Sequence, residues 1–212
     1  MRTSILLEKL WIDKKEFITS AELRDYCRGL KMDYASVIHY LIKRKSLVRV
    51  FKGIFYVKSI EEIKLGKRRY SHLEIVSRGL SLKGVKNWYF GLHTALKLNN
   101  MTHEHFAMEE VVSDSLFRAK PVNIAGYKFR FVKISPPLLR FGIKNENGGM
   151  RYSDPEKTIL DFIYLSRHGG MEFDRILMDV SDWSENISRN RLKEYSKNYP
   201  KTVAAAVKGM TG

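Results

Sequence analysis

The stretch LVRVFKGIFYV, residues 47–57, places two short apolar runs on either side of a Lys-Gly pair. The β-branched and aromatic residues favour two strands, and Lys52-Gly53 favours a tight turn, so the stretch predicts a β-hairpin. Arg49 and Lys52 place positive charge at or near the tip of this hairpin. A buried hairpin has no need of such charges, so they indicate a surface that meets an anionic partner.

Three segments with helical periodicity precede the hairpin. Residues 4–10 have the pattern of a short amphipathic helix, and Ser20 is placed to cap a second helix that ends near Gly29. Asp33 is placed to cap a third helix. The apolar residues of the third helix recur at helical spacing and predict its buried face: Val37, Ile38, Leu41 and Ile42. Three helices and a two-stranded wing are the order of a winged helix-turn-helix, which we predict for residues 1–58.

In a helix-turn-helix, the recognition helix lies in the major groove of duplex DNA, and phosphate contacts fix its position. We therefore expect base contacts from the outward face of the third helix and phosphate contacts from the cations that follow it. The predicted DNA-binding residues are Tyr34, Ser36, His39, Tyr40, Lys43, Arg44, Arg49 and Lys52. The alternative is a domain that binds only proteins, which would not need a basic surface.

The charge of the chain supports a polyanionic partner. The net charge is +15, and residues 1–58 hold 13 Lys and Arg against 6 Asp and Glu. Between Asp33 and Glu61 there is no acidic residue, although that segment holds six cations. Charge carried only for solubility would not cluster in this way, so nucleic acid is the first expectation and an acidic membrane surface the second.

The rest of the chain differs from the first 58 residues in composition and in predicted secondary structure. Residues 59–70 are polar and are predicted to be a linker. The basic triplet Lys67-Arg68-Arg69 at its end is interpreted either as a further phosphate contact or as part of a solvated linker. Residues 71–212 mix predicted helices with a strand-rich region, without the regular alternation that builds a parallel sheet. We therefore predict an α+β protein, with the winged helix followed by a mixed domain in which helices flank a small sheet.

The carboxylates of SDPEKTILDF, residues 153–162, are the strongest indication of catalysis. Asp154, Glu156 and Asp161 lie close together in sequence, and paired carboxylates can perform acid–base chemistry or hold a metal ion. However, Ser153 and Glu156 have the spacing of a capping box, and Pro155 suits a first helical turn. We therefore predict the start of a helix here and no catalytic residue; a metal-dependent enzyme acting on nucleic acids remains the alternative hypothesis.

The sequence does not contain the residues that a disulfide, a metal site or a nucleotide-binding loop would need. Cys27 is the single cysteine, and His103 and His105 are the one close histidine pair, with no further ligands in view. The sequence contains no P-loop, GxGxxG or GxSxG motif. We predict neither a metal site nor a cofactor. No apolar run approaches the ~18–20 residues of a membrane span, so we expect a cytoplasmic protein without a membrane partner.

Three motifs resemble the AbiE-type antitoxins of type IV toxin–antitoxin systems. These are LIKRKSLVRVFKGIFYV at residues 41–57, YFGLHTALKLNNMT at residues 89–102, and YSDPEKTILDFIYLSRHGG at residues 152–170. The motifs occur in the order of the family, and the resemblance spans roughly residues 20–170. Ser46 and Asn99-Asn100 stand where many members have glycine, and asparagine tolerates the left-handed backbone of a turn.

The resemblance implies two functions. The N-terminal domain would bind inverted repeats in its own promoter and repress transcription, and the C-terminal domain would antagonise a toxin of the nucleotidyltransferase class. A solitary regulator without a toxin is the alternative within this class, and a pure protein-interaction module lies outside it. We expect a monomer or a weak dimer, since either can occupy inverted repeats.

Overall fold

The computed structural model describes residues 2–184 and 187–211 and shows an α+β fold. The chain divides into two compact units, of which the first comprises Met1–Lys86 and Asn123–Tyr127 and the second comprises Asn87–Val122 and Lys128–Gly212. The predicted α+β class is therefore confirmed. None of the helices among the described residues combines the length and the apolar character needed to cross a bilayer.

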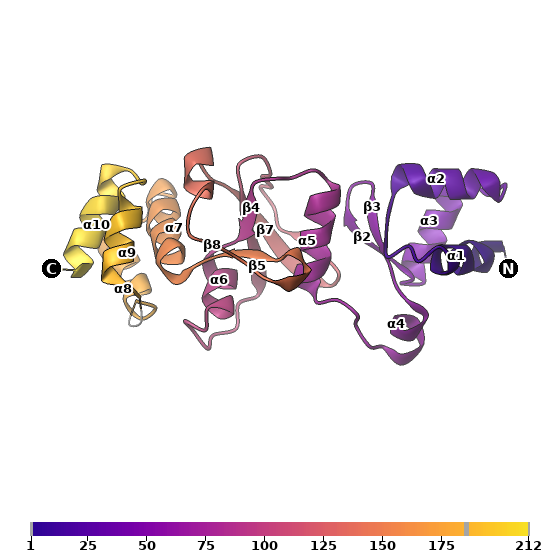
Figure 1. Cartoon of the computed structure of the whole chain (residues 1–212), viewed down its shortest axis with the longest axis horizontal. Helices are drawn as coiled ribbons and strands as arrows, with labels where there is room; N and C mark the ends of the chain where they lie inside the picture. Colours follow the sequence, from indigo (N-terminus) through magenta and orange to yellow (C-terminus); the bar gives the residue numbers. More distant parts are fainter. Residues whose placement is uncertain (1, 185–186, 212) are drawn as a thin grey trace. The chain divides into compact units, whose positions relative to one another are not determined.

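The first unit contains helices and one three-stranded sheet (Figure 1). Its elements in chain order are α1 (Arg2–Ile12), β1 (Phe17–Thr19), α2 (Ser20–Gly29), α3 (Tyr34–Lys43), β2 (Leu47–Phe51), β3 (Ile54–Val57), α4 (Ile60–Leu65) and α5 (His72–Leu82). The strand order is β1-β3-β2, with both pairs antiparallel, so β3 is the central strand and the predicted hairpin is its pairing with β2.

The core of this unit forms where α1, α2, α3 and the sheet meet. The predicted buried face of α3 is largely correct, because Val37, Ile38 and Leu41 are buried and Ile42 is partly buried against them. Cys27 is buried in the same core and has no disulfide partner. In β2, Leu47 is buried in this core and Val50 is buried on the other face of the strand, while Arg49 is exposed.

The cap of α2 differs from the prediction by one residue. Thr19, and not Ser20, is the N-cap: its hydroxyl accepts from the Glu22 amide at 3.2 Å, and the Glu22 carboxylate accepts from the Thr19 amide at 2.9 Å. This reciprocal pair requires an acid or amide three residues after the cap, which Thr19 has and Ser20 lacks.

The segment predicted as a linker contains a helix. Ser59 caps α4 through the same reciprocal arrangement with Glu62, whose carboxylate also accepts from the Tyr56 hydroxyl at 2.5 Å. The Ser59 amide and the Tyr56 hydroxyl therefore hold the Glu62 carboxylate in place, and Glu62 is buried although it is acidic. Residues 59–70 thus contain a short helix attached to β3, instead of a free connector.

The first unit also extends beyond the predicted boundary at residue 71. Helix α5 packs on β2 so closely that a Cβ on Gly79 would lie 2.5 Å from Val50 Cγ1 and 3.0 Å from the Phe51 ring. Contacts of this kind place the division at residue 87 and add the turn Asn123–Tyr127 to the first unit. The sequence boundary followed a change of composition, whereas the structural one follows packing.

The second unit has a mixed six-stranded sheet in the order β6-β7-β5-β4-β9-β8, except that Asn123–Tyr127 at the turn between β6 and β7 is counted with the first unit. Pairs β4–β9 and β5–β7 are parallel, and pairs β4–β5 and β8–β9 are antiparallel. Its elements are β4 (Trp88–Phe90), α6 (Leu92–Leu98), β5 (Met108–Ser113), β6 (Val122–Ile124), β7 (Tyr127–Lys133), η1 (Pro136–Leu139), β8 (Ile143–Asn145), η2 (Asn147–Gly149), β9 (Arg151–Ser153), α7 (Pro155–His168), α8 (Phe173–Ser181), α9 (Arg189–Ser196) and α10 (Lys201–Thr211).

Helices α7 to α10 gather on one side of this unit and share a core with the strands (Figure 1). The middle of α7 is apolar and fully buried at Ile159, Leu160 and Ile163, which pack with residues of α8, α9 and α10. The sheet contributes Tyr89 and Val112 to the same core. The expected arrangement of a small sheet with flanking helices is therefore present in this unit.

Candidate nucleic-acid interface

Helix α3 is held in place by its cap and by its apolar face. The Asp33 carboxylate accepts from the Ser36 amide at 2.8 Å, as predicted, and this hydrogen bond lowers the pKa of Asp33. Burial of Val37, Ile38 and Leu41 fixes the rotation of the helix about its axis. The opposite face is consequently presented to solvent.

The exposed face of α3 carries most of the predicted base-contacting residues. Ser36 and His39 are exposed, and the side chain of Tyr40 is 41% exposed. Tyr34 is partly exposed, and it also packs against the core of the unit. The guanidinium of Arg24 lies 4.6 Å from the centre of the Tyr34 ring, so Arg24 from α2 adjoins the same face.

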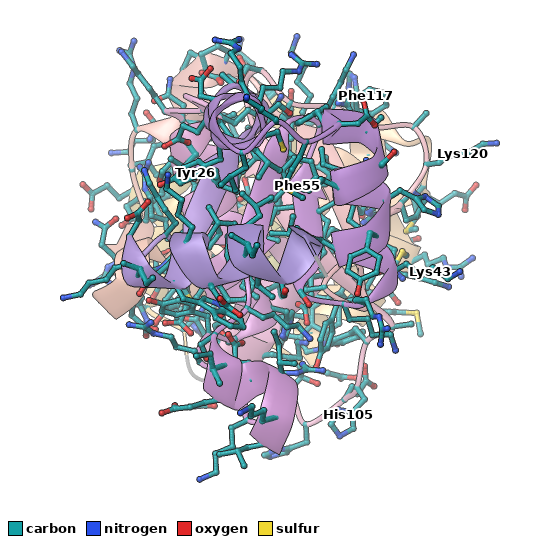
Figure 2. The ribbon with its side chains drawn as sticks, turned by 90° about the vertical axis from the view of Figure 1, so that its right-hand side faces the viewer. Tyr26, Lys43, Phe55, His105, Phe117 and Lys120 are labelled. Atoms are coloured by element: carbon teal, nitrogen blue, oxygen red, sulfur yellow. The ribbon has the colours of Figure 1, made fainter. Side chains whose placement is uncertain are left out.

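The predicted phosphate-contacting residues lie at the end of α3 and on the hairpin. Lys43, labelled in Figure 2, is exposed on the last turn of α3, and Arg44 is the exposed residue that follows. Arg49 is exposed on β2 with its guanidinium 5.8 Å from the Phe55 ring, and Lys52 is exposed in the turn. Within the described residues none of these four cations forms an ion pair, so their charges remain available to an anionic partner.

The hairpin turn has a fixed position relative to α2. Gly53 adopts φ +78°, a left-handed conformation that suits glycine, and its carbonyl oxygen accepts from the Ser20 amide at 2.8 Å. The pairing of β2 with β3 includes an irregularity between Arg49 and Phe51. Lys52 is therefore carried by a short turn that is tied to the start of the second helix.

Three further cations of this unit belong to basic segments of the sequence but lie outside the predicted DNA-binding set. Lys45 adopts φ +57° directly after α3, Lys58 follows β3, and Arg68 lies in the segment that was predicted as a linker. The amide of Lys58 donates to Ser46, and its carbonyl accepts from the Trp11 indole at 2.8 Å, which fixes its backbone. The acid-free segment indicated Lys45 and Lys58, but only the fold shows where they project.

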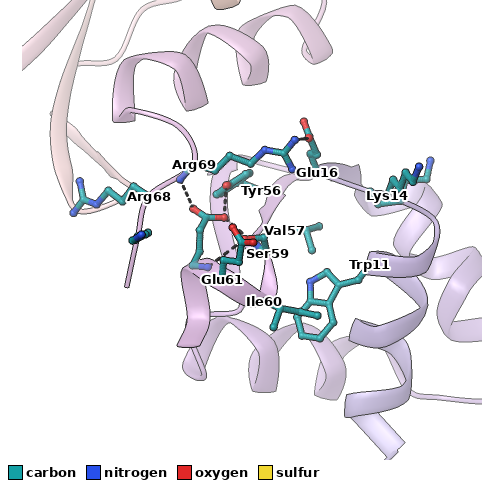
Figure 3. A pocket seen from close by; sticks show the side chains of 13 residues that line it. Trp11, Lys14, Glu16, Tyr56, Val57, Ser59, Ile60, Glu61, Arg68 and Arg69 are labelled. Carbon is teal, nitrogen blue, oxygen red and sulfur yellow. Dashed lines mark hydrogen bonds and ion pairs between the residues drawn. The ribbon is translucent and has the colours of Figure 1, made fainter. Parts of the chain in front are cut away.

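A first pocket of this unit, the connector pocket, has a volume of about 620 Å³ and lies between α1 and α4 (Figure 3). Trp11 and Ile60 form apolar parts of its wall, and cations and acids both line it. Arg69 pairs with Glu16 at 2.7 Å within this wall. Because both signs of charge are present, this pocket does not select a ligand by charge.

In the second unit, the carboxylates at the start of α7 are engaged in structure. Asp154, and not Ser153, is the N-cap: it accepts from the Lys157 amide at 2.8 Å and from the Tyr195 hydroxyl at 3.0 Å, while burial raises its pKa. Glu156 accepts from the Ser188 amide at 2.8 Å, so the predicted Ser153–Glu156 capping box is wrong. Among the described residues no group of three or more His, Cys, Asp and Glu could hold a metal ion.

Asp161 belongs to a fully buried polar cluster. Its carboxylate lies 3.2 Å from Lys157 Nζ and accepts from the hydroxyls of Tyr89 and Tyr199, each at 2.7 Å. The Lys157 ammonium also lies 4.8 Å from the centre of the Phe141 ring. Burial, together with the charge of Asp161, raises the pKa of both tyrosines well above the ordinary value. Since the cluster is closed to solvent, it supports the core and has no access to a substrate.

A second pocket, of about 470 Å³, lies in the second unit beside α6 and α8. Its polar wall includes His93, whose Nδ1 lies 3.0 Å from the buried carboxylate of Glu110, and Arg130, which pairs with the same carboxylate. Ser166 also lines the pocket, but within the described residues no hydrogen bond joins it to His93. The groups therefore do not form the relay that activates a serine nucleophile.

The α+β architecture is shared with a solved structure. The chain aligns over 97% of its length with 74% of the Rv2827c protein from Mycobacterium tuberculosis, with a TM-score of 0.61 and 15% sequence identity. At this level of identity the likeness shows the fold alone. No model of a known protein family matches the sequence, and no curated protein matches it.

Proposed function

We propose that this protein is a sequence-specific DNA-binding transcriptional regulator. In this proposal residues 1–58 form a winged helix-turn-helix in which α3 is the recognition helix and the β2–β3 hairpin is the wing. Helix α3 would enter the major groove, and the hairpin would lie on the flanking phosphates. The observation that supports the proposal is the joint exposure of Lys43, Arg44, Arg49 and Lys52, none of which pairs with an acid in the part of the chain that the structure describes. These cations lie beside an exposed helix face that carries Ser36, His39 and Tyr40.

The side chains on that face have the chemistry of base recognition. His39 and Tyr40 can donate and accept hydrogen bonds, and Ser36 can do both through one hydroxyl. Such groups distinguish base pairs by the pattern of donors and acceptors in the major groove. The four cations have no sequence preference of their own, so they would supply affinity while α3 supplies specificity.

We further propose that the regulator acts as the antitoxin of a type IV toxin–antitoxin system and represses its own promoter. The support is the order of the three motifs that resemble the AbiE-type family, together with the capped α7 that begins within the last of them. The second unit would then antagonise a nucleotidyltransferase toxin. Co-expression with a neighbouring nucleotidyltransferase gene tests this part: the chain should restore the growth that the toxin arrests, and unchanged arrest would leave a solitary regulator.

DNA binding is tested by fluorescence anisotropy with a duplex taken from upstream of the gene, at several salt concentrations. If the four cations each meet one phosphate, log K should fall with log salt with a slope of about −3.6. A duplex of the same length and composition in scrambled order is the control for specificity. A slope near zero, or equal affinity for both duplexes, would contradict the proposal.

A further inference from the structure

A second pocket of the first unit, which we call the hairpin pocket, has more cations than acids among its lining residues. It has a volume of about 470 Å³ and lies beside β2, the edge strand of the sheet. Its charged wall consists of Lys45, Arg49, Lys58, Arg68 and one acid, Glu62, with His72 and Tyr70 beside them. The cations come from four places in the chain: the end of α3, β2, the end of β3 and the segment between α4 and α5.

The one acid of the wall does not neutralise these cations. The Glu62 carboxylate accepts from the Tyr56 hydroxyl, from the Ser59 amide at 2.9 Å and from the Arg69 amide at 3.3 Å. The Glu62 oxygens are thus hydrogen-bonded to a hydroxyl and to backbone amides and not to the cations of the wall, and the residue is buried. The excess of positive charge in the pocket therefore faces solvent.

The cationic side chains of the pocket offer only hydrogen-bond donors. Among the described residues Lys45 and Lys58 form no ion pair, and each ammonium has three donors and no acceptor. Arg68 donates one of its five N–H groups to the Tyr127 hydroxyl at 2.8 Å, which fixes the side chain and leaves further donors. A ligand that accepts hydrogen bonds from these donors and balances their charge must carry several acceptor oxygens and more than one negative charge. A phosphate group or a run of phosphates has this chemistry.

We propose that the hairpin pocket binds phosphate, and that in the DNA complex it receives the backbone of the duplex beyond the hairpin. This inference rests on the proposed function, since the DNA would have to lie on α3 and the hairpin first. Arg49 belongs to both surfaces and connects them. The pocket would thus extend the contacts from the hairpin to the α4–α5 segment, and the same chemistry would also accept a free phosphate compound.

Three charge-removing variants test the pocket: Lys45→Gln, Lys58→Gln and Arg68→Gln. If these three cations also meet phosphates, the slope of the unsubstituted protein should be about −6.3 in place of about −3.6. Anisotropy titrations with the upstream duplex should then show the slope becoming less negative by about 0.9 for each variant and by about 2.7 for the triple variant. Lys64→Gln is the matched control, because Lys64 is exposed on α4 and does not line this pocket. Its slope should equal that of the unsubstituted protein.

A second arm uses inorganic pyrophosphate in calorimetry. Binding that is lost in Arg68→Gln and kept in Lys64→Gln, with unchanged DNA slopes, would assign the pocket to a free phosphate compound. Unchanged slopes together with no pyrophosphate binding would overturn the proposal. If the unsubstituted protein binds no DNA, the proposed function fails, whereas the pyrophosphate titration still decides whether the pocket binds phosphate.

Discussion

The amide of Ser20 donates a 2.8 Å hydrogen bond to the carbonyl oxygen of Gly53, which joins the start of α2 to the turn of the β2–β3 hairpin. The neighbouring residues reinforce this link, since Thr19 pairs with Ile54 in the sheet. The hairpin that carries Lys52 is therefore not an independent flap. Its position relative to the helices is set by backbone hydrogen bonds.

Substitution of Gly53 by alanine should strain this junction. Gly53 has φ +78°, and an added Cβ would lie 3.2 Å from the Ser20 hydroxyl. We expect a loss of about 1 kcal/mol in the free energy of unfolding, measured by urea denaturation. Gly29→Ala is the control, because Gly29 has no positive φ and nothing within 4 Å of an added Cβ. Equal stability of the two variants would show that the turn tolerates a side chain.

Substitution of His39 by alanine should relax sequence preference. His39 is exposed at the centre of the α3 face, away from the core, so folding should be preserved. The loss of a base contact should lower the discrimination between the upstream duplex and a scrambled one by about 1–3 kcal/mol, measured by anisotropy. Lys52→Gln provides the contrast, because a lost phosphate contact should weaken both duplexes alike. Unchanged discrimination in His39→Ala would remove this residue from the recognition surface.

The buried pair Lys157–Asp161 should be intolerant of single substitutions. Removal of one partner leaves an unpaired charge in a fully buried site, which typically costs about 3–5 kcal/mol. We therefore expect Lys157→Met and Asp161→Asn each to lower the urea midpoint strongly. The double variant Lys157→Met with Asp161→Asn should lose less than the sum of the single losses. Additive losses would mean that the two charges do not stabilise each other.

The capping pair of α2 predicts a pH-dependent contribution to stability. Hydrogen bonds from Lys15 and from the Thr19 amide lower the pKa of Glu22 in the folded protein below its ordinary value of 4.5. An acid with a lowered pKa stabilises the fold above its unfolded pKa, and this stabilisation is lost as the pH falls through the folded pKa. Glu22→Gln should therefore be less stable than the unsubstituted protein at neutral pH, and the difference should shrink below about pH 4.

Urea denaturation at several pH values measures that difference. Glu8→Gln is a suitable control, because Glu8 is exposed on α1 and forms no ion pair within the described residues. A constant difference between Glu22→Gln and the unsubstituted protein across the acid range would contradict the link between the cap and its charge.

Helix α3 and the β2–β3 hairpin could be predicted from the sequence because local residues mark where each begins or turns, whereas strand β1 was not predicted. Asp33 precedes an apolar stripe at helical spacing, and Lys52-Gly53 separates two runs of strand-forming residues. The structure confirms the cap, the buried face and the hairpin. Seven of the eight predicted DNA-binding residues are exposed, and Tyr34 is partly exposed because its ring packs against the core and beside Arg24.

What the sequence did not indicate depends on contacts between distant residues. The hairpin pocket brings Lys45 and Arg68 together across more than twenty positions, and only the path of the chain through α4 does this. Glu110 and His93 meet because strand β5 lies beside α6, and neither residue has a sequence pattern of its own. The cap of α7 was predicted one residue too early because Ser153 and Asp154 are both capable caps.

The close approach of Gly79 to β2 has a practical consequence for anyone dividing this chain. A fragment that stops at residue 58 would lose the helix that covers Val50 and Phe51, and it would offer that bare apolar strip to neighbouring molecules. Precipitation of such a fragment would say nothing about its affinity for DNA. A longer piece that retains α5 keeps the strip shielded.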